Sequence, residues 1–514
     1  LPSLRLPLDR DHGVFLTMGR CILEGGIPYQ DCWDTKPPGV FYLFAVIARL
    51  FGSSIWGVRV VDLFWLMALS YLLFRFAERA LGPRVAALGV AFHSVAYFQL
   101  GYRNTANPES FLMLPVLGSF LIVLARRGKT VLKYSLAGAL MGVAFWFKFN
   151  AIIFAPLVLI LPYLERKSAA QRNSAVSDTP GKRGEWIRII LAFAGGLMLV
   201  GAAVPLYFLL TGAWQAFYET FFKVVPLYTQ MAIERTPSYL WWSLAQLQMR
   251  LGLWTELMLA AVLALAWKPE ERRKVAPVLL AALLGLVSVA VQFRFWIYSF
   301  ATSLPFLSVL WAYVAVRIFG QFRSWSADFG IRSWRVARVL VWVVPVSLVL
   351  TPFVSFSADF FDRYRSAAIW ARGPEAAHRD YSWNALYGHW GEMMEVIDFV
   401  KGNSDEGDSV YVWGFEPLIY YRSDRRSPTR FITNMPQIAP WCPPEWREEL
   451  MRELRADPPT LLVVNRDDAV YPILYTRLDS EQSLAEFPAL TQFLTERYIS
   501  ARDFHAFHVF RLRR

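Results

Sequence analysis

The sequence has 514 residues, of which 55% are hydrophobic and only 18% are charged, and its mean hydropathy is +0.32. So few charges exclude a string of ordinary soluble domains and indicate a chain that lies mostly in a membrane. The net charge of +12 does not indicate a nucleic-acid partner, because the Lys and Arg residues sit in short loops between apolar runs, as they do in membrane proteins.

A polar segment, residues 1–55, precedes the first apolar run long enough to cross a bilayer. The sequence begins at Leu1 without an initiating methionine, a signal peptide or a hydrophobic span. We therefore expect one further span to precede Leu1. Cys21 and Cys32 both lie in this segment. A disulfide and two free thiols are both compatible with their spacing, and there is no zinc-type ligand pattern.

Ten apolar runs follow as candidate membrane spans. They cover residues 56–78, 84–101, 109–125, 132–148, 149–164, 188–211, 249–267, 275–292, 296–318 and 337–356. Together with the span expected before Leu1, they predict eleven spans.

The loops between these runs alternate in charge. Basic clusters stand at 75–84, 126–133, 166–188, 268–274 and 317–338, whereas the short loops between them carry one basic residue each. Because basic loops stay in the cytoplasm, residues 1–55, the loop 212–248 and the tail after about 357 are predicted to lie outside. The aromatic loop 212–248 is expected to form amphipathic helices along the interface.

The tail changes character at about residue 390. Its pattern predicts a small α/β domain with helices at 392–401 and 445–455, strands at 409–413, 430–433 and 460–464, and a final helix and strand that end at Leu512.

The most specific motif lies in the first segment. Residues 25–39 read Gly-Gly-Ile-Pro-Tyr-Gln-Asp-Cys-Trp-Asp-Thr-Lys-Pro-Pro-Gly, and the acidic pair Asp9 and Asp11 stands before a predicted helix that ends at Leu23. This pattern resembles the first external loop of the GT-C glycosyltransferases, and among them the bacterial branch related to protein O-mannosyltransferases and the lipid A aminoarabinose transferase. The resemblance implies a sugar donor carried on a polyprenyl phosphate.

Later segments resemble the same family more loosely. Asn107-Pro108-Glu109 is similar to its Asn-x-Glu region, Lys148 matches a lysine at the outer end of a span, and residues 294–298 resemble an Arg-aromatic-His-Tyr signature. His12 stands where Glu is common and Ile297 stands where His is common. A family role at those two positions is therefore in doubt here.

Glycosyl transfer needs a base that takes the proton of the acceptor hydroxyl, and cations that stabilise the leaving phosphate. Asp11 is acidic and external, close to where a lipid tail holds the donor phosphate, and the resemblance implies that it is the catalytic base, with inversion at the anomeric carbon. Asp9 is the second candidate. The alternative for both is a solvated acidic pair before a helix.

The candidate ligands of the donor phosphate are the basic residues at the outer ends of spans, namely Lys36, Arg59, Arg103, Lys148 and Arg294. Each has a structural alternative. Lys36 can be a turn residue, Arg59 can pair with Asp62 inside the bundle, and Lys148 can be a snorkelling anchor.

The candidates for the wall of the site, or for contacts with the acceptor, are His12, Asp34, Asn107, Glu109 and Tyr298. Asp34 also reads as a turn residue, and Asn107-Pro108-Glu109 also reads as a helix start with proline in its first position. The histidines are scattered, so no metal site is predicted, although the resemblance leaves a divalent metal cofactor open.

We therefore expect an α-helical polytopic membrane protein of the GT-C fold, with a first loop at 1–55 that holds the site, a transmembrane bundle at 56–357 and an external segment at 358–514. The expected function is hexosyl or pentosyl transfer from a polyprenyl phosphate to an external lipid, glycan or protein acceptor, in the bacterial inner membrane. The alternative is a transporter or flippase for a lipid-linked or polar substrate, which internal repeats with broken helices in matching halves would favour. The identity of the sugar, the class of acceptor and the oligomeric state are left open.

Overall fold

The structure is a computed structural model, which describes residues 7–54, 56–101, 103–170, 183–231, 258–265, 268–292, 295–328 and 389–513, and the isolated positions 4, 238, 241 and 245. The predicted span 337–356 and the candidate Arg294 lie outside the described residues, and the span 249–267 is described only at 258–265. The chain forms two compact units. The first unit comprises 1–61, 204–234 and 364–514, and the second comprises 62–203 and 235–363.

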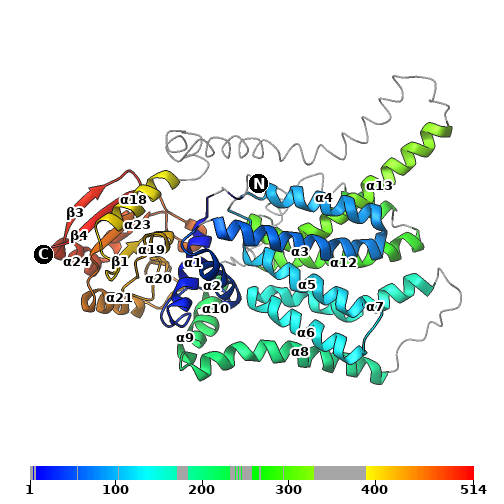
Figure 1. Cartoon of the computed structure of the whole chain (residues 1–514), viewed down its shortest axis with the longest axis horizontal. Helices are drawn as coiled ribbons and strands as arrows, with labels where there is room; N and C mark the ends of the chain where they lie inside the picture. Colours follow the sequence, from blue (N-terminus) through cyan, green and yellow to red (C-terminus); the bar gives the residue numbers. More distant parts are fainter. Residues whose placement is uncertain are drawn as a thin grey trace. The chain divides into compact units, whose positions relative to one another are not determined.

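Long apolar helices follow the predicted spans closely. They are α3 (Trp56–Leu81), α4 (Pro83–Gln99), α5 (Pro108–Leu124), α6 (Thr130–Phe147), α7 (Ala155–Ala170), α8 (Arg183–Leu210), α12 (Pro269–Ala290) and α13 (Leu304–Asp328). Proline occupies the first position of α4, α5 and α12, where its missing N–H removes no helical hydrogen bond. Among the described residues, α3, α6, α8, α12 and α13 are long and apolar enough to cross a membrane. The chain is an integral membrane protein, and Figure 1 shows these helices running alongside one another.

Two of the predicted spans begin differently from the prediction. The run 149–164 starts with the 3₁₀ helix η2 (Phe149–Phe154) before α7, and the run 296–318 starts with the 3₁₀ helix η4 (Ile297–Thr302) before α13. Asn150 lies in η2, and Ser299 and Thr302 lie in η4.

Glycines let α6 and α8 approach closely, as small residues do between membrane helices. A Cβ atom on Gly196 would collide with the carbonyl group of Ser135 on α6, whereas a Cβ on the neighbouring Gly195 would meet nothing within 4 Å.

Gly196→Ala is therefore expected to destabilise the folded protein by about 1–3 kcal/mol through overpacking. Gly195→Ala, one position away on the same helix, serves as the matched control and should leave stability nearly unchanged. Thermal unfolding of both variants in detergent measures the difference. Equal melting temperatures would contradict the close α6–α8 contact.

The first unit contains the polar segment that opens the chain. Helix α1 (Arg10–Leu23) packs on α2 (Pro38–Phe51), and the Cys21–Cys32 disulfide closes the turn between them, with the two Cα atoms 6.5 Å apart. Of the two states that the spacing allowed, a disulfide and two free thiols, the structure contains the disulfide. The part of the aromatic loop that belongs to this unit is helical, through α9 (Trp214–Tyr218), the π-helix η3 (Glu219–Val224) and α10 (Val225–Met231).

The predicted C-terminal α/β domain is present in the same unit. Its helices are α18 (Trp390–Gly402), α19 (Leu418–Ser423), α20 (Met435–Ile438), α21 (Glu445–Ala456), α22 (Tyr471–Leu474), α23 (Ser480–Ser483), η6 (Leu484–Glu486) and α24 (Pro488–Arg497). Its strands are β1 (Val410–Trp413), β2 (Leu461–Asn465), β3 (Tyr498–Asp503) and β4 (Phe507–Leu512). The sheet order is β1-β2-β4-β3, in which β1 and β2 are parallel and the other pairs antiparallel.

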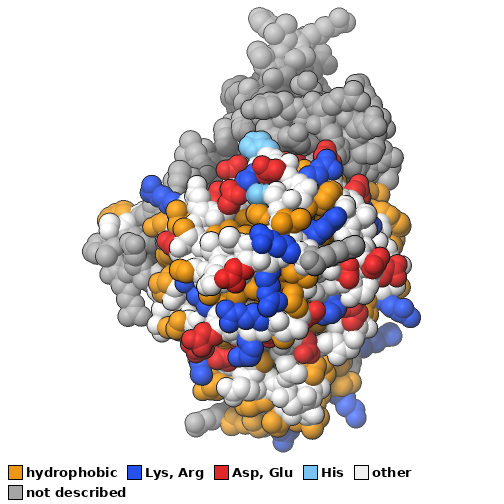
Figure 2. Space-filling view, turned by 90° about the vertical axis from the view of Figure 1, so that its left-hand side faces the viewer, with side chains coloured by type: hydrophobic (Ala, Val, Ile, Leu, Met, Phe, Trp, Pro, Cys, Tyr) orange, Lys and Arg blue, Asp and Glu red, His pale blue; other side chains and the backbone are white. Residues whose placement is uncertain are grey.

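The strand predicted at 430–433 is wrong. This stretch is an irregular connection before α20, and the backbone carbonyl of Arg430 accepts a hydrogen bond from the N–H of Trp33, in the first segment, at 2.8 Å. Its apolar residues are buried, which explains the strand-like pattern, but their hydrogen bonds lie outside the sheet. The exposed face of the domain in Figure 2 carries acidic and basic side chains interspersed, as expected for a surface in water.

The first segment is held against the C-terminal domain by polar contacts at several points. Arg10 donates to the carboxylate of Glu416 at 2.7 Å, and Thr17 donates to the carbonyl of Pro417 at 2.9 Å. Gly13 of α1 lies directly against Leu418, where a Cβ would come within 3.1 Å of the leucine side chain. These contacts join residues about 400 positions apart and hold α1 against the C-terminal domain.

Candidate functional site

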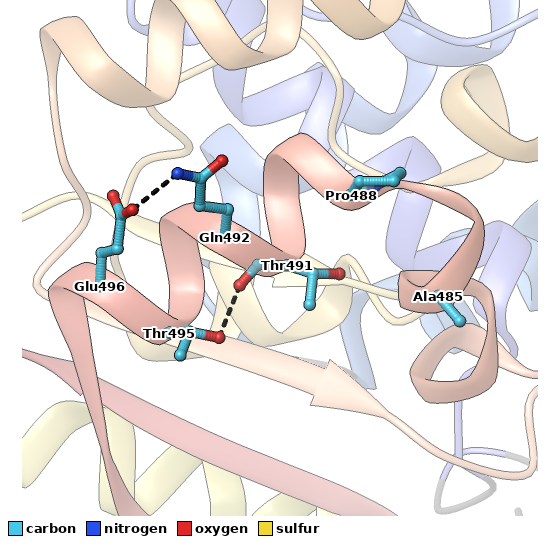
Figure 3. A pocket seen from close by; sticks show the side chains of 6 residues that line it. All are labelled: Ala485, Pro488, Thr491, Gln492, Thr495 and Glu496. Carbon is cyan, nitrogen blue, oxygen red and sulfur yellow. Dashed lines mark hydrogen bonds between the residues drawn. The ribbon is translucent and has the colours of Figure 1, made fainter.

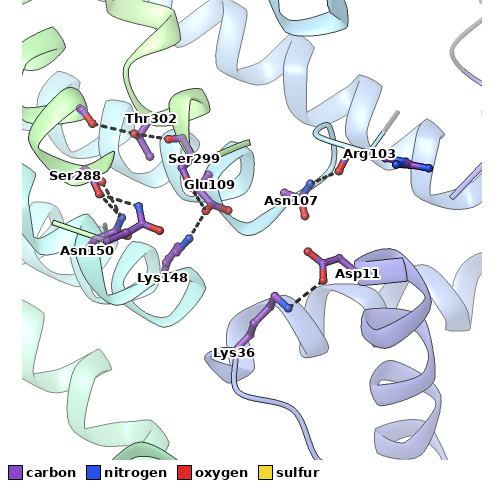
Figure 4. A network of polar contacts seen from close by, with 12 residues as sticks. Asp11, Lys36, Arg103, Asn107, Glu109, Lys148, Asn150, Ser288, Ser299 and Thr302 are labelled. Atoms are coloured by element: carbon purple, nitrogen blue, oxygen red, sulfur yellow. Dashed lines mark hydrogen bonds and ion pairs between the residues drawn. The ribbon is translucent and has the colours of Figure 1, made fainter. Parts of the chain in front are cut away.

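A carboxylate and an ammonium group meet in the first segment. Asp11 lies in the first turn of α1, and Lys36 lies in the turn before α2, whose start is marked by Pro37 and Pro38. The Asp11 Oδ1 and Lys36 Nζ atoms are 3.2 Å apart, and the two side chains are 18% and 25% exposed. Figure 4 shows the two side chains pointing toward each other from these elements. The pair is therefore shielded but still open to a ligand.

Asp34 completes this charged group. Its carboxylate accepts from the backbone N–H of Lys36 at 3.0 Å and lies 3.7 Å from the Lys36 Nζ. Burial alone would lower the pKa of Lys36, but the charges of Asp11 and Asp34 outweigh it and raise that pKa above its ordinary value. Burial also raises the pKa of the Asp34 carboxyl, although Lys36 opposes this shift. Lys36 is thus positively charged across the physiological pH range.

Asp9 and His12 have a structural task at the start of α1. They form a capping box, in which the Asp9 side chain meets the backbone of His12 and the His12 Nδ1 accepts the N–H of Asp9 at 3.0 Å. The His12 ring is fully buried and stacks on Phe44 at a centroid distance of 6.4 Å. Such a box satisfies two of the free N–H groups at a helix start, and it orients the turn that presents Asp11.

A second polar cluster lies at one end of the helices in the second unit. Glu109, in the first turn of α5, forms an ion pair with Lys148 at the end of α6. Ser299 of η4 lies 3.4 Å from the same carboxylate. Asn150 of η2 donates to the carbonyl and hydroxyl oxygens of Ser288 at 3.0 and 2.8 Å. Figure 4 shows these side chains extending from different elements of the unit.

The remaining candidates make the following contacts. Arg59 is buried and donates to the carbonyl of Pro7, and Asp62 accepts from the hydroxyl of Tyr97. The amide of Asn107, the residue before α5, donates to the backbone carbonyl of Arg103 at 3.0 Å, and the side chain of Arg103 is exposed. The ring of Tyr298 lies 5.6 Å from the Lys148 ammonium group.

Sequence reasoning missed Asn150, Ser288 and Ser299. Short polar residues inside apolar runs are common, and nothing local distinguishes these three. A weak signal was available for Asn150, which follows the candidate Lys148 by two positions.

Among the described residues, neither a surface hollow nor a metal cluster offers another site. A shallow hollow beside α24, lined by Ala485, Pro488, Thr491, Gln492, Thr495 and Glu496, is open to solvent, and Gln492 and Glu496 bond to each other there (Figure 3). Within the described residues, no three His, Cys, Asp or Glu side chains come together in a way that could hold a metal ion.

Parts of the chain match two family models. Residues 35–176 match the model described as Dolichyl-phosphate-mannose-protein mannosyltransferase, and residues 391–495 match the Putative competence-induced protein Ccs4 C-terminal domain. The first match contains Lys36, Asn107, Glu109 and Lys148. No curated protein matches the chain.

Solved structures resemble the chain over nearly its full length. ArnT from Cupriavidus metallidurans bound to undecaprenyl phosphate is 15% identical, with a TM-score of 0.55 over 99% of this chain and 94% of that one. The apo state of the same protein is 14% identical, with a TM-score of 0.53 over 97% and 92%. An oligosaccharyltransferase from Archaeoglobus fulgidus, tethered with an acceptor peptide, is 11% identical, with a TM-score of 0.47 over 88% and 65%. The predicted fold, a GT-C helical membrane protein with a small C-terminal sheet domain, is confirmed.

Proposed function

We propose that this GT-C membrane protein is a glycosyltransferase that moves a sugar from a polyprenyl-phosphate donor to an acceptor outside the cytoplasm, with inversion at the anomeric carbon. The observation that carries the proposal is the pairing of Asp11 with Lys36, 3.2 Å apart, in a segment whose motif resembles the first loop of these enzymes. The match of residues 35–176 to the mannosyltransferase model and the fold shared with an undecaprenyl-phosphate-bound protein support it.

In the proposed reaction, the acceptor hydroxyl attacks the anomeric carbon while the carboxylate of Asp11 takes its proton. The bond between that carbon and the phosphate oxygen breaks, and polyprenyl phosphate leaves with the electron pair. Lys36 stabilises the negative charge on the phosphate as it departs. Because the phosphate competes with Asp11 for the ammonium group, binding of the donor would also free the Asp11 carboxylate to act as a base.

The charge pattern of the loops supports the location proposed for this reaction. The first segment and the C-terminal domain would face the extracytoplasmic side of a bacterial inner membrane, since the basic clusters lie in the alternate loops. There the lipid tail of the donor would hold its phosphate at the membrane surface, within reach of Lys36.

The test is transfer from a radiolabelled polyprenyl-phosphate sugar in inverted and right-side-out vesicles that contain the protein. We expect a labelled glycoside to form only where the donor reaches the external face, with release of unlabelled polyprenyl phosphate. Movement of intact donor across the membrane without glycoside formation would instead support the flippase. Vesicles that contain the Asp11→Asn variant provide the matched blank.

A further inference from the structure

The polar cluster of the second unit presents three buried oxygen atoms with an unused capacity to accept hydrogen bonds. These are Asn107 Oδ1, Glu109 Oε2 and Asn150 Oδ1, and no donor among the described residues reaches them. Asn107 is fully buried and Glu109 is 1% exposed. Leaving such atoms without a donor is costly in a folded protein, so their arrangement calls for a ligand that supplies donors.

The three oxygens are held in place by the other atoms of the same side chains. The amide nitrogen of Asn107 donates to the carbonyl of Arg103, and that of Asn150 donates to Ser288. These donations fix which end of each amide is nitrogen, because a carbonyl oxygen cannot face another acceptor. The second oxygen of Glu109 belongs to a carboxylate whose first oxygen meets Lys148 and Ser299. All three free positions are therefore acceptors on fixed side chains.

The elements that carry these side chains come together at one end of the bundle. Helix α5 packs on η4 and on η2, and η2 in turn packs on α12. Figure 4 shows Glu109 with its second carboxylate oxygen turned away from Lys148. Asn107 and Glu109 stand two residues apart at the start of α5, and Asn150 lies in η2, which packs on α5.

The charges of the cluster decide which chemistry suits it. An anion such as a phosphate is disfavoured, because the available atoms are lone-pair acceptors and one is a carboxylate oxygen. A metal cation is disfavoured because the ammonium group of Lys148 already neutralises Glu109 and would repel a second positive charge. A neutral molecule rich in hydroxyl donors satisfies both conditions.

An aromatic surface adjoins the cluster. Trp296 and Tyr298 are half-buried in and before η4, and their rings are nearly parallel, 6.3 Å apart with an angle of 14°. A sugar ring carries hydroxyl groups at its edge and C–H groups on its faces. It therefore fits a site that combines acceptor oxygens with aromatic rings.

We propose that this cluster is a subsite for the hydroxyl groups of a sugar ring, with Asn107, Glu109 and Asn150 as the accepting residues and Lys148 as the positioning residue that holds Glu109. The inference rests on the proposed function, since the sugar that the subsite would hold is that of a glycosyl donor or acceptor. The sugar comes either from the donor or from a glycan acceptor, and both present the same hydroxyl chemistry.

Equilibrium binding to the full-length protein in nanodiscs tests the subsite without requiring turnover. The probes are polyprenyl-phosphate hexose, polyprenyl phosphate without a sugar, and a methyl hexoside added with saturating polyprenyl phosphate. Wild-type protein should prefer the sugar-bearing donor over the bare one if the subsite takes the donor sugar, and should bind the methyl hexoside if it takes the acceptor.

Asn107→Ala, Asn150→Ala and Glu109→Gln should each weaken sugar recognition about two- to tenfold, as expected for one hydrogen bond, with the affinity for bare polyprenyl phosphate unchanged. Asn104→Ala is the matched control, because its side-chain amide lies in the same loop but donates to the carbonyl of Leu100. If Glu109→Gln fails to fold, the double variant Glu109→Gln/Lys148→Met removes both charges together.

Three results would overturn the subsite. They are equal binding of the sugar-bearing and bare donors together with no binding of the hexoside, sugar recognition that the variants leave intact, and recognition that requires Mn²⁺ and is lost with EDTA. Wild-type protein that prefers the sugar but forms no glycoside would contradict the proposed function while leaving the subsite standing.

Discussion

Asp11→Asn is expected to lower the turnover number for sugar transfer by about 10²–10⁴-fold, the usual contribution of a positioned base. Asparagine keeps the shape of the side chain but cannot take the proton of the acceptor hydroxyl. The remaining rate would reflect binding and orientation of the two substrates alone. Initial rates at saturating donor, with a radiolabelled polyprenyl-phosphate sugar, measure the effect.

The control for this variant is Asp31→Asn. Asp31 lies in the same segment, is exposed, and accepts a hydrogen bond from the backbone N–H of Ile27. It should retain nearly full turnover. Equal rates for Asp11→Asn and the wild type, at equal amounts of folded protein, would rule out Asp11 as the base.

Lys36→Met is expected to reduce kcat/KM for the donor by about 10²–10³-fold, comparable to the loss of one group that stabilises charge in a transition state. Methionine keeps most of the length and apolar character of the side chain but carries no charge. Inhibition by the product polyprenyl phosphate should weaken in parallel, because the same ammonium group would bind it. Initial rates with added polyprenyl phosphate measure both effects.

The charge balance around Lys36 requires a second variant. Without the ammonium group, buried Asp34 and nearby Asp11 would lose their partner, and the protein could be destabilised for that reason alone. The double variant Lys36→Met/Asp34→Asn removes one charge of each sign and separates the two effects. Transfer near the wild-type rate in this double variant, with unweakened product inhibition, would show that Lys36 does not bind the phosphate.

Most of the fold could be predicted because the signals are local. A span is recognised from its own apolar residues, and proline marks the starts of α4, α5 and α12. The 3₁₀ turns at 149–154 and 297–302 could not be predicted, since they differ from helix only in backbone geometry. The false strand at 430–433 shows the same limit. The buried residues there belong to a segment that contacts Trp33, which is far away in the sequence.

The candidate site could be predicted in part. Asp11, Asp34 and Lys36 share one segment and one recognisable pattern, and they lie together in the structure. Glu109 and Lys148 form an ion pair between the ends of two neighbouring helices. The separation of the two residues along the chain does not indicate this pair. Asn150, Ser288 and Ser299 are ordinary residues by themselves. Only packing of the helices makes them a polar cluster.

The contacts that join the first segment to the C-terminal domain have a consequence for biosynthesis. Thr17 and its partner Pro417 are 400 residues apart, and at about 5–20 residues per second the ribosome needs about 20–80 s to make the stretch between them. During that time, α1 exists without the surface that holds it. The segment that carries Asp11 is therefore made long before the C-terminal domain can hold it. A protein cut short in translation would lack these contacts.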